Sequence, residues 1–374
     1  MQEEYSYSGR LNSSIVSFYR DTLTVLRQPR LLLRALRVFQ RQRKAARRRW
    51  QHEAAGTHIP PFLIFSVTNR CNLRCTGCYQ RLQHRDTSEE VDTATLNKIF
   101  AESLELGIST ILLAGGEPLM HSELLETAGR YPQLLFPLFT NGLMINDQTI
   151  TFLKKNWHIF PVFSMEGGQS ETDLRRGEGV FQNLKTVLPV MQKKQIFCGV
   201  SFTVTSENFE ILTDDSYLEE LVKDGCGLFF YIEYIPVAEG SDHLQLREEQ
   251  QRKLHTLMEK LRRKHKAVFI TFPGDEEKYG GCLAAGRGFV HVTADGSLEP
   301  CPFAPYSDTN VKALSLREAL QSDFLQAVRE NHDLLQEHNG SCALRENREL
   351  VQQLLNNSKP AKQHPDASCN KPVI

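Results

Sequence analysis

The sequence predicts an α/β fold in which helices cover a parallel sheet that curls into a partial (β/α)6 barrel. From Phe62 onward, short apolar segments alternate with amphipathic ones across short loops, giving six strand–helix units. The strand segments are apolar on both faces, as in parallel sheets that are buried between layers. Six units predict a barrel that stays open on one side, because a full eight-unit barrel needs more chain.

Each unit consists of a strand and the helix that follows it. The expected strands cover residues 62–67, 110–113, 134–139, 159–163, 197–204 and 228–234. The expected helices cover residues 95–106, 123–131, 148–155, 181–193, 217–223 and about 246–265, and a further strand is expected at 268–272. Ligands of such sheets bind beyond the carboxyl ends of the strands, so the loops that follow each strand are the candidate site.

The N-terminal segment, residues 1–57, is expected to precede the barrel as a basic amphipathic helix. Residues 13–52 have a helical pattern that Pro29 can interrupt, with Leu32, Leu36 and Phe39 on one face. Positions 20–49 hold eleven basic residues and one acid, although the whole chain carries a net charge of −1. Two interpretations stay open: the helix packs on the barrel, or it docks on an anionic membrane surface or an acidic partner. Nucleic acid is not expected, because the rest of the chain is acidic.

Length and composition predict two domains in an ordinary globular protein of 374 residues. No signal-peptide pattern and no apolar run of about 18 residues is found, so a cytoplasmic protein is expected, peripheral on the inner face of the membrane if the basic helix docks there. The nine cysteines are therefore expected to be reduced, and six of them fall in two groups that could each serve a metal.

The first group lies directly after the first expected strand, in the loop Cys71-Asn-Leu-Arg-Cys75-Thr-Gly-Cys78. Three thiolates on one loop are too few for a tetrahedral four-cysteine zinc site, but they can hold three irons of a [4Fe–4S] cluster and leave the fourth iron open. A zinc site with a distant fourth ligand and ordinary core thiols are the alternatives from spacing alone.

This C-x3-C-x2-C loop and the strand before it resemble the signature loop of the radical S-adenosylmethionine (radical SAM) enzymes. The resemblance covers about residues 60–345 and implies that Cys71, Cys75 and Cys78 hold the catalytic [4Fe–4S] cluster, whose open iron binds SAM. It also implies reductive cleavage of SAM to a 5′-deoxyadenosyl radical, which abstracts hydrogen from a substrate, with a flavodoxin- or ferredoxin-type electron donor.

Later motifs support the resemblance because each follows an expected strand. They are Gly115-Gly116-Glu117-Pro118, Thr140-Asn141-Gly142, Ser164-Met165-Glu166-Gly167, Arg175-Arg176-Gly177-Glu178-Gly179-Val180-Phe181 and Thr203-Val204-Thr205. The resemblance implies SAM contacts at Gly77, Tyr79, Gly115, Gly116, Glu117, Pro118, Asn141, Ser164, Glu166, Arg176 and Val204. Two positions depart from the family pattern. Glu166 stands where Asp is frequent, and Gly77 stands before the third cysteine, where many members have an aromatic residue.

The second group, Cys282, Cys301 and Cys342, follows the barrel. Asp295-Gly296 between short apolar runs predicts a hairpin between Cys282 and Cys301. The order of cysteine, hairpin, Cys-Pro, helix and cysteine resembles the SPASM or twitch extension of radical SAM enzymes, which implies one auxiliary [4Fe–4S] cluster. Core thiols with a zinc site are the alternative, and Cys369 is a further candidate ligand.

The expected domains are residues 1–57, the barrel at 58–272, the extension at 273–350 and a helix end with a disordered tail at 351–374. The substrate is expected to be a peptide or a lipid-linked, membrane-associated molecule. A non-catalytic iron–sulfur protein that transfers electrons or acts as a scaffold is the alternative, although it leaves the motifs at the strand ends unexplained.

Overall fold

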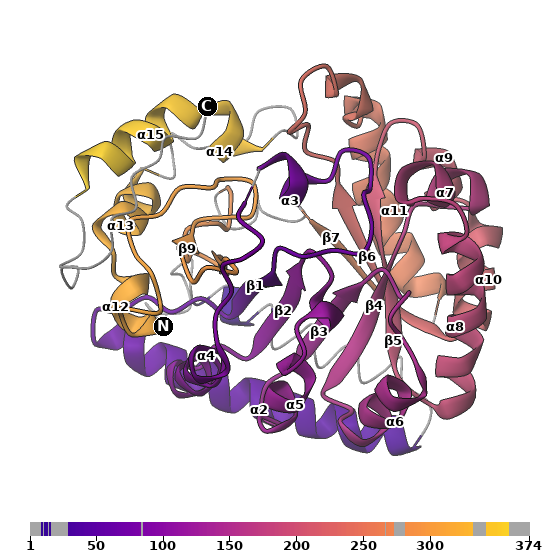
Figure 1. Ribbon diagram of the computed structural model, residues 1–374, viewed down its shortest axis with the longest axis horizontal. Coiled ribbons are helices and arrows are strands. Elements are labelled where there is room, and N and C mark those ends of the chain that lie inside the picture. Colours follow the sequence, from indigo (N-terminus) through magenta and orange to yellow (C-terminus); the bar gives the residue numbers. More distant parts are fainter. Residues whose placement is uncertain are drawn as a thin grey trace.

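A single sheet organises the chain, as the computed structural model shows for residues 9, 11–13, 15, 29–83, 85–265, 267–272, 281–331 and 342–358. Within these residues nine strands lie in the order β7-β6-β5-β4-β3-β2-β1-β8-β9 (Figure 1). The strands are β1 (Phe62–Thr68), β2 (Thr110–Gly115), β3 (Phe136–Thr140), β4 (Ile159–Met165), β5 (Cys198–Val204), β6 (Cys226–Glu233), β7 (Val268–Phe272), β8 (Phe289–Val292) and β9 (Leu298–Glu299). All pairings are parallel except that of β8 with β9. The predicted parallel α/β sheet is confirmed.

Helices cover the outer face of this sheet (Figure 1). The α-helices are α2 (Pro29–Ala54), α3 (Tyr79–Leu82), α4 (Thr93–Leu106), α5 (Leu124–Gly129), α6 (Asp147–Lys155), α7 (Gln169–Arg176), α8 (Val180–Lys194), α9 (Phe209–Leu212), α10 (Asp215–Lys223), α11 (Glu248–Lys264), α12 (Leu316–Leu320), α13 (Asp323–Glu330), α14 (Ala343–Glu346) and α15 (Arg348–Asn357). Short 3-10 helices form at η2 (Pro118–Met120) and η3 (Asp242–Leu244).

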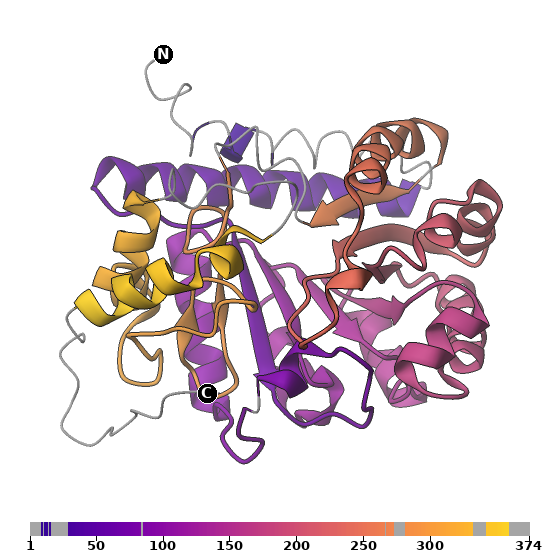
Figure 2. The ribbon, with the colours of Figure 1, turned by 90° about the horizontal axis from the view of Figure 1, so that it is seen from above.

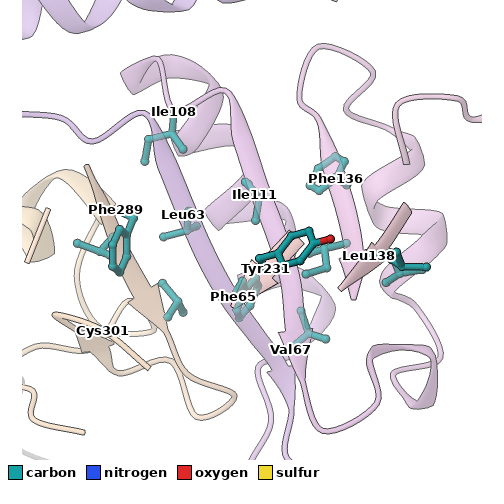
Figure 3. Close-up of a cluster of buried hydrophobic side chains, with 14 of the residues drawn as sticks. Leu63, Phe65, Val67, Ile108, Ile111, Phe136, Leu138, Tyr231, Phe289 and Cys301 are labelled. Carbon is teal, nitrogen blue, oxygen red and sulfur yellow. The ribbon is translucent and has the colours of Figure 1, made fainter. Parts of the chain in front are cut away.

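Each strand presents side chains to both faces of the sheet, because successive side chains point to opposite sides. In β1, Leu63, Phe65 and Val67 are fully buried and belong to the apolar cluster in Figure 3. Phe65 packs edge-on against Phe100 of α4, with ring centroids 6.4 Å apart, so this face meets the outer helices. Ser66 lies on the other, inner face.

The inner face is concave. Phe139 of β3 and Phe230 of β6 have ring centroids 5.2 Å apart, although β4 and β5 lie between these strands in the sheet. Two residues on such distant strands touch only if the sheet curls, as the predicted partial barrel requires.

The C-terminal extension continues the sheet instead of starting a new one. β8 pairs with β1 in parallel, from Phe62 opposite Phe289 to Phe65 opposite Val292. β9 then returns antiparallel to β8 through the predicted turn, where Gly296 has φ +90°. The hairpin was expected from Asp295-Gly296, but its pairing with β1 was not.

Helix α2 runs across the ends at which the strands begin, opposite the cysteine loop (Figure 2). Arg49 is 1% exposed and donates to the Gly107 carbonyl just before β2, at 2.6 Å. The Arg41 guanidinium lies 5.3 Å from the ring centroid of Trp157, just before β4. The expected apolar face is only partly buried, because Leu36 is 40% exposed and Phe39 is half-buried. The buried side chains of α2 are those of Gln42, Ala46 and Arg49. The arginines therefore contribute to packing.

Among the residues that the structure describes, no helix is both long and apolar enough to span a bilayer. The polar composition of residues 1–12 predicts a loose N-terminus, and this is wrong for Leu11 and Asn12, which are helical and buried, with Asn12 Oδ1 accepting from Arg49 Nε at 2.8 Å. Residues 1–8, the expected tail at residues 359–374 and Cys369 lie outside the described residues.

Candidate functional site

The first cysteine loop leaves the carboxyl end of β1 and ends at α3. Cys71 is exposed, whereas Cys75 and Cys78 are half-buried. Gly77, between the last two cysteines, has φ +66°, a conformation that favours glycine. The loop therefore presents all three thiols at the edge of the sheet where parallel α/β proteins bind ligands.

The Gly115-Gly116 pair fixes the start of this loop. Gly116 N–H donates to the Thr68 carbonyl at 2.7 Å, and Glu117 N–H donates to the Arg70 carbonyl at 2.8 Å. A Cβ at Gly116 would lie 2.0 Å from the Arg70 oxygen, and one at Gly115 would lie 2.4 Å from the Thr68 oxygen. The glycines thus allow the end of β2 to approach the chain immediately before Cys71.

Glu117 is fully buried beside the loop. Its carboxylate accepts hydrogen bonds from the Thr140 hydroxyl at 2.8 Å and from Asn141 N–H at 2.9 Å. Burial raises the pKa of the Glu117 carboxyl, and these hydrogen bonds oppose the rise. The Asn141 amide donates to Asn72 Oδ1 at 2.7 Å, so the ends of β2 and β3 are joined to the cysteine loop through polar side chains.

A second buried carboxylate, Glu166, follows β4. It is 1% exposed and receives Arg175 Nη1 at 2.6 Å and Arg176 Nε at 2.8 Å. Burial alone would lower the pKa of Arg175, but the neighbouring Glu166 carboxylate raises it above its usual value. The Arg175 carbonyl accepts from Thr76 N–H at 2.8 Å, so this ion-pair cluster also holds the cysteine loop.

The remaining predicted SAM positions lie on the same edge of the sheet. Pro118 is buried at the start of η2, Ser164 is partly exposed near the end of β4, and Val204 is buried at the end of β5. Asn208 follows β5, and its amide donates to the carbonyls of Glu166 and Thr203, each at 3.0 Å. The SAM contacts themselves stay predictions.

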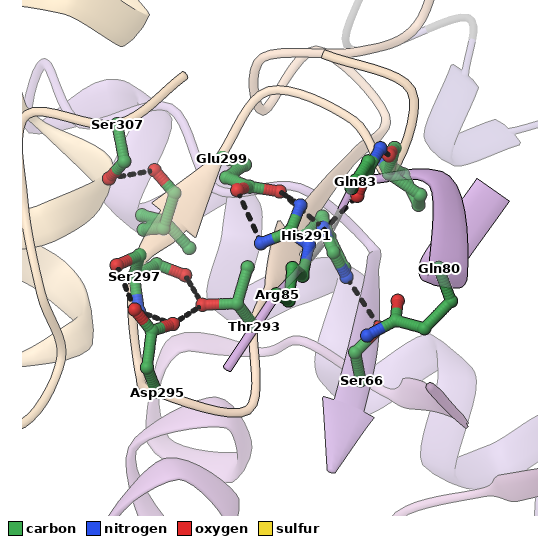
Figure 4. A network of polar contacts seen from close by, with 12 residues as sticks. Ser66, Gln80, Gln83, Arg85, His291, Thr293, Asp295, Ser297, Glu299 and Ser307 are labelled. Carbon is green, nitrogen blue, oxygen red and sulfur yellow. Dashed lines mark hydrogen bonds and ion pairs between the residues drawn. The ribbon is translucent and has the colours of Figure 1, made fainter. Parts of the chain in front are cut away.

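A buried polar network joins the cysteine loop to the C-terminal extension (Figure 4). His291 Nε2 lies 2.7 Å from the Ser66 hydroxyl, and His291 Nδ1 lies 2.8 Å from Glu299 Oε2. Arg85 completes the network with two hydrogen bonds to the Glu299 carboxylate, both at 2.8 Å. Burial lowers the pKa of His291, and Glu299 opposes this. Residues from β1, β8, β9 and the segment after α3 are thus held together by hydrogen bonds and by the Arg85–Glu299 ion pair.

Tyr79 touches the same network from the cysteine loop. Burial raises the pKa of its phenol, Cys78 adds to the rise, and a hydrogen bond with Ser66 opposes it. The Tyr79 ring packs against Phe303, with centroids 5.1 Å apart, and the Gln83 amide donates to the Pro302 carbonyl at 2.7 Å. The segment after Cys78 therefore packs directly against the segment after Cys301.

The second cysteine group lies in the extension. Cys301 is 5% exposed, and Cys282 and Cys342 are half-buried against the core. In the part of the chain that the structure describes, no three His, Cys, Asp or Glu side chains are grouped as ligands of one metal ion, and this holds for the first cysteine loop as well as for the second group. The auxiliary cluster stays a prediction. Cys198 and Cys226 are buried in β5 and β6, as expected for small apolar residues.

The residues at the first loop fit an iron–sulfur cluster with SAM. Three thiols are the donor type that iron–sulfur clusters take, and they lie on one loop. Close by, the Tyr234 hydroxyl is buried without a hydrogen-bond partner among the described residues, as expected for a group whose partner is a ligand. The sequence did not single out Tyr234, Ser66, His291 or Glu299.

Comparison with known proteins agrees with this site. The family model described as the Radical SAM superfamily matches residues 65–222. The chain is 27% identical over 209 residues to Fe-coproporphyrin III synthase of Methanosarcina barkeri, covering 52% of each chain. It is 23% identical over 320 residues to AdoMet-dependent heme synthase of the same organism, covering 78% of this chain and 89% of that protein. The chain thus spans about half the length of the first relative and most of the second.

The fold is also found in a solved structure. SuiB of Streptococcus suis, bound to the precursor peptide SuiA, matches 77% of this chain and 70% of its own, with a TM-score of 0.60 and 17% identity. This likeness concerns the fold alone. The cysteine loop at the carboxyl edge of a curled parallel sheet agrees with the family match, and residues 65–222 of the chain form a domain of the radical SAM type.

Proposed function

We propose that this protein uses SAM and a [4Fe–4S] cluster to abstract a hydrogen atom from an organic substrate. The observation that carries the proposal is the cysteine loop, held at the carboxyl ends of β1 and β2 by the bonds of Gly116 and Glu117. Cys71, Cys75 and Cys78 would hold the cluster. With an electron from a flavodoxin- or ferredoxin-type donor, the cluster and SAM supply a 5′-deoxyadenosyl radical, with methionine as the other product.

In this proposal the protein residues bind SAM and orient it. Glu117 offers a buried carboxylate for the SAM amino group, and Asn141 lies beside it at the end of β3. Glu166 lies at the end of β4, where the ribose is expected, with its charge balanced by Arg175 and Arg176. The apolar inner face between Phe139 and Phe230 keeps water from the reacting carbon.

For the substrate, a carboxylated tetrapyrrole is the first candidate. Two relatives are named Fe-coproporphyrin III synthase and AdoMet-dependent heme synthase, and the second match covers most of both chains. A peptide is the second candidate, because the structure of SuiB with a precursor peptide bound has the same fold.

A lipid-linked substrate and peripheral membrane contact through residues 13–52 rest on α2 alone. Leu36 and the basic side chains of Arg37, Arg43, Lys44 and Arg47 are exposed on this helix. Removal of residues 1–57 would abolish binding to anionic vesicles if this contact exists.

The extension is proposed to hold one auxiliary [4Fe–4S] cluster through Cys282, Cys301 and Cys342. The supporting observation is the packing of the Cys301 segment against Tyr79 and Gln83, which follow Cys78. The auxiliary cluster in the extension would therefore lie close to the loop that contains Cys71, Cys75 and Cys78.

The function is tested by anaerobic reconstitution followed by incubation with dithionite and SAM. We expect the wild type to form 5′-deoxyadenosine and methionine in a one-to-one ratio. Cys198→Ala, whose cysteine lies in β5 away from the loop, is expected to form the same products at the wild-type rate. Cys75→Ala is expected to form neither product above background. Activity of Cys75→Ala equal to that of Cys198→Ala would contradict the proposal.

The substrate class is tested in the same assay. Addition of Fe-coproporphyrin III is expected to raise the rate of 5′-deoxyadenosine formation and to change the porphyrin absorbance. No response to the porphyrin would exclude Fe-coproporphyrin III as the substrate and make a peptide the next candidate. A peptide substrate predicts a short precursor gene beside this one.

A further inference from the structure

Tyr234 points into the concave side of the sheet. It follows β6 directly, and its N–H donates to the Val204 carbonyl at the end of β5, at 2.9 Å. Side chains alternate along an extended chain, so Tyr234 shares a face with Phe230, which meets Phe139 across the barrel interior. Tyr231 has the opposite direction, and its hydroxyl donates to the Leu212 carbonyl at 2.8 Å.

The Tyr234 hydroxyl is buried without a partner. The residue is 5% exposed, and its hydroxyl has no hydrogen bond among the described residues. Buried tyrosine hydroxyls are usually hydrogen-bonded, since an unpaired one loses its contact with water and gains nothing. The unpaired hydroxyl thus lowers the stability of the protein without its cofactors, and it stabilises the protein once an acceptor atom lies beside it.

The position of this hydroxyl indicates what the acceptor is. A Cβ built on Gly77 would lie 3.2 Å from the Tyr234 oxygen and 3.5 Å from its Cε2. The end of the phenol therefore touches the cysteine loop between Cys75 and Cys78. Gly77 leaves room for it there, at the position where this chain departs from the aromatic residue of many family members.

We propose that Tyr234 is a cofactor-binding residue whose hydroxyl donates a hydrogen bond to an acceptor atom seated at the cysteine loop. This inference rests on the proposed function. Two acceptors share the required chemistry: a sulfur atom of the iron–sulfur cluster, and a nitrogen or oxygen atom of SAM. In either case Tyr234, directly after β6, makes a contact that Gly77 cannot make because it has no side chain.

The substitution Tyr234→Phe has opposite expected effects on the iron-free and the loaded protein. In the iron-free protein it removes an unpaired hydroxyl, so we expect the midpoint of thermal unfolding to rise by about 1–3 °C. Tyr231→Phe, three residues earlier and within β6, removes a paired hydroxyl and is expected to lower the midpoint by a similar amount. A purely structural role for Tyr234 would give two variants that behave alike.

The loaded protein identifies the acceptor. If it is a cluster sulfur, Tyr234→Phe lowers the reduction potential measured by EPR titration without SAM, since hydrogen bonds to the sulfurs help set this potential. If it is an atom of SAM, the potential is unchanged and SAM binds about tenfold more weakly to Tyr234→Phe. Tyr231→Phe is expected to change neither quantity.

Either of those results, together with the stabilised iron-free protein, supports the inference. A Tyr234→Phe variant with a lowered midpoint, or one with wild-type potential and wild-type SAM affinity, overturns it. A wild-type protein that takes up neither iron nor SAM refutes the proposed function itself, and the two failures are therefore distinguishable.

Discussion

Replacement of Glu166 by alanine is expected to lower the free energy of unfolding by about 3–5 kcal/mol, the usual cost of removing one partner of a buried ion pair. Glu166 is 1% exposed, and its carboxylate accepts from Arg175 Nη1 at 2.6 Å and from Arg176 Nε at 2.8 Å. Without it, two guanidinium groups with side chains only 21% and 12% exposed lose the charge that balances them. Urea unfolding of the iron-free protein measures the loss.

The control for Glu166 is an ion pair of the same type on the surface. Glu126 and Arg130 also form a carboxylate–guanidinium pair at 2.9 Å, but their side chains are 75% and 54% exposed. Glu126→Ala is expected to change the free energy of unfolding by less than about 1 kcal/mol. Equal losses in Glu166→Ala and Glu126→Ala would show that the buried cluster does not hold the strand ends.

Replacement of Glu299 by alanine is the second change with a large expected effect. It leaves His291, which is fully buried, and Arg85 without their shared carboxylate, and we expect a loss of about 3–5 kcal/mol. Because Arg85 and Gln83 tie the segment after Cys78 to β9 and Pro302, amide hydrogen exchange is also expected to rise at residues 79–83 and 299–303.

Glu53 provides the matched control for this second change. Its carboxylate lies 2.7 Å from His58 Nδ1, in a glutamate–histidine pair whose side chains are 42% and 17% exposed. Glu53→Ala is expected to cost less than about 1 kcal/mol and to leave exchange at residues 79–83 unchanged. Unchanged exchange in Glu299→Ala would mean that the network does not connect the two cysteine loops.

Local sequence signals predicted most of the sheet. The strands from β1 to β7 were expected within a few residues of their bounds because each is a short apolar run bounded by turn residues. Helix α7 was not expected, since Gln169–Arg176 is short and has only one large apolar residue, Leu174.

Contacts between distant parts of the chain could not be predicted. Ser66 and His291 are 225 residues apart in the sequence. The four residues of β8 have no sequence pattern that predicts their pairing with β1. For the same reason the sequence identified Cys71, Cys75, Cys78 and Glu117 through a local motif but missed Tyr234, whose significance lies in its contact with Gly77. The role of α2 was left open, because an arginine that binds a carbonyl and one that faces water look alike in sequence.

We propose that Cys71, Cys75 and Cys78 hold an iron–sulfur cluster that binds SAM. Iron and sulfide analysis with EPR, with and without SAM, on anaerobically reconstituted protein tests this assignment. The variants are the alanine triples at Cys71/Cys75/Cys78 and at Cys282/Cys301/Cys342. We expect about eight irons in the wild type, about four in each triple, and a SAM-dependent signal only where the first three cysteines remain. A Cys71/Cys75/Cys78→Ala protein that keeps all its iron, or still shows the SAM-dependent signal, would show that these cysteines do not hold the SAM-binding cluster.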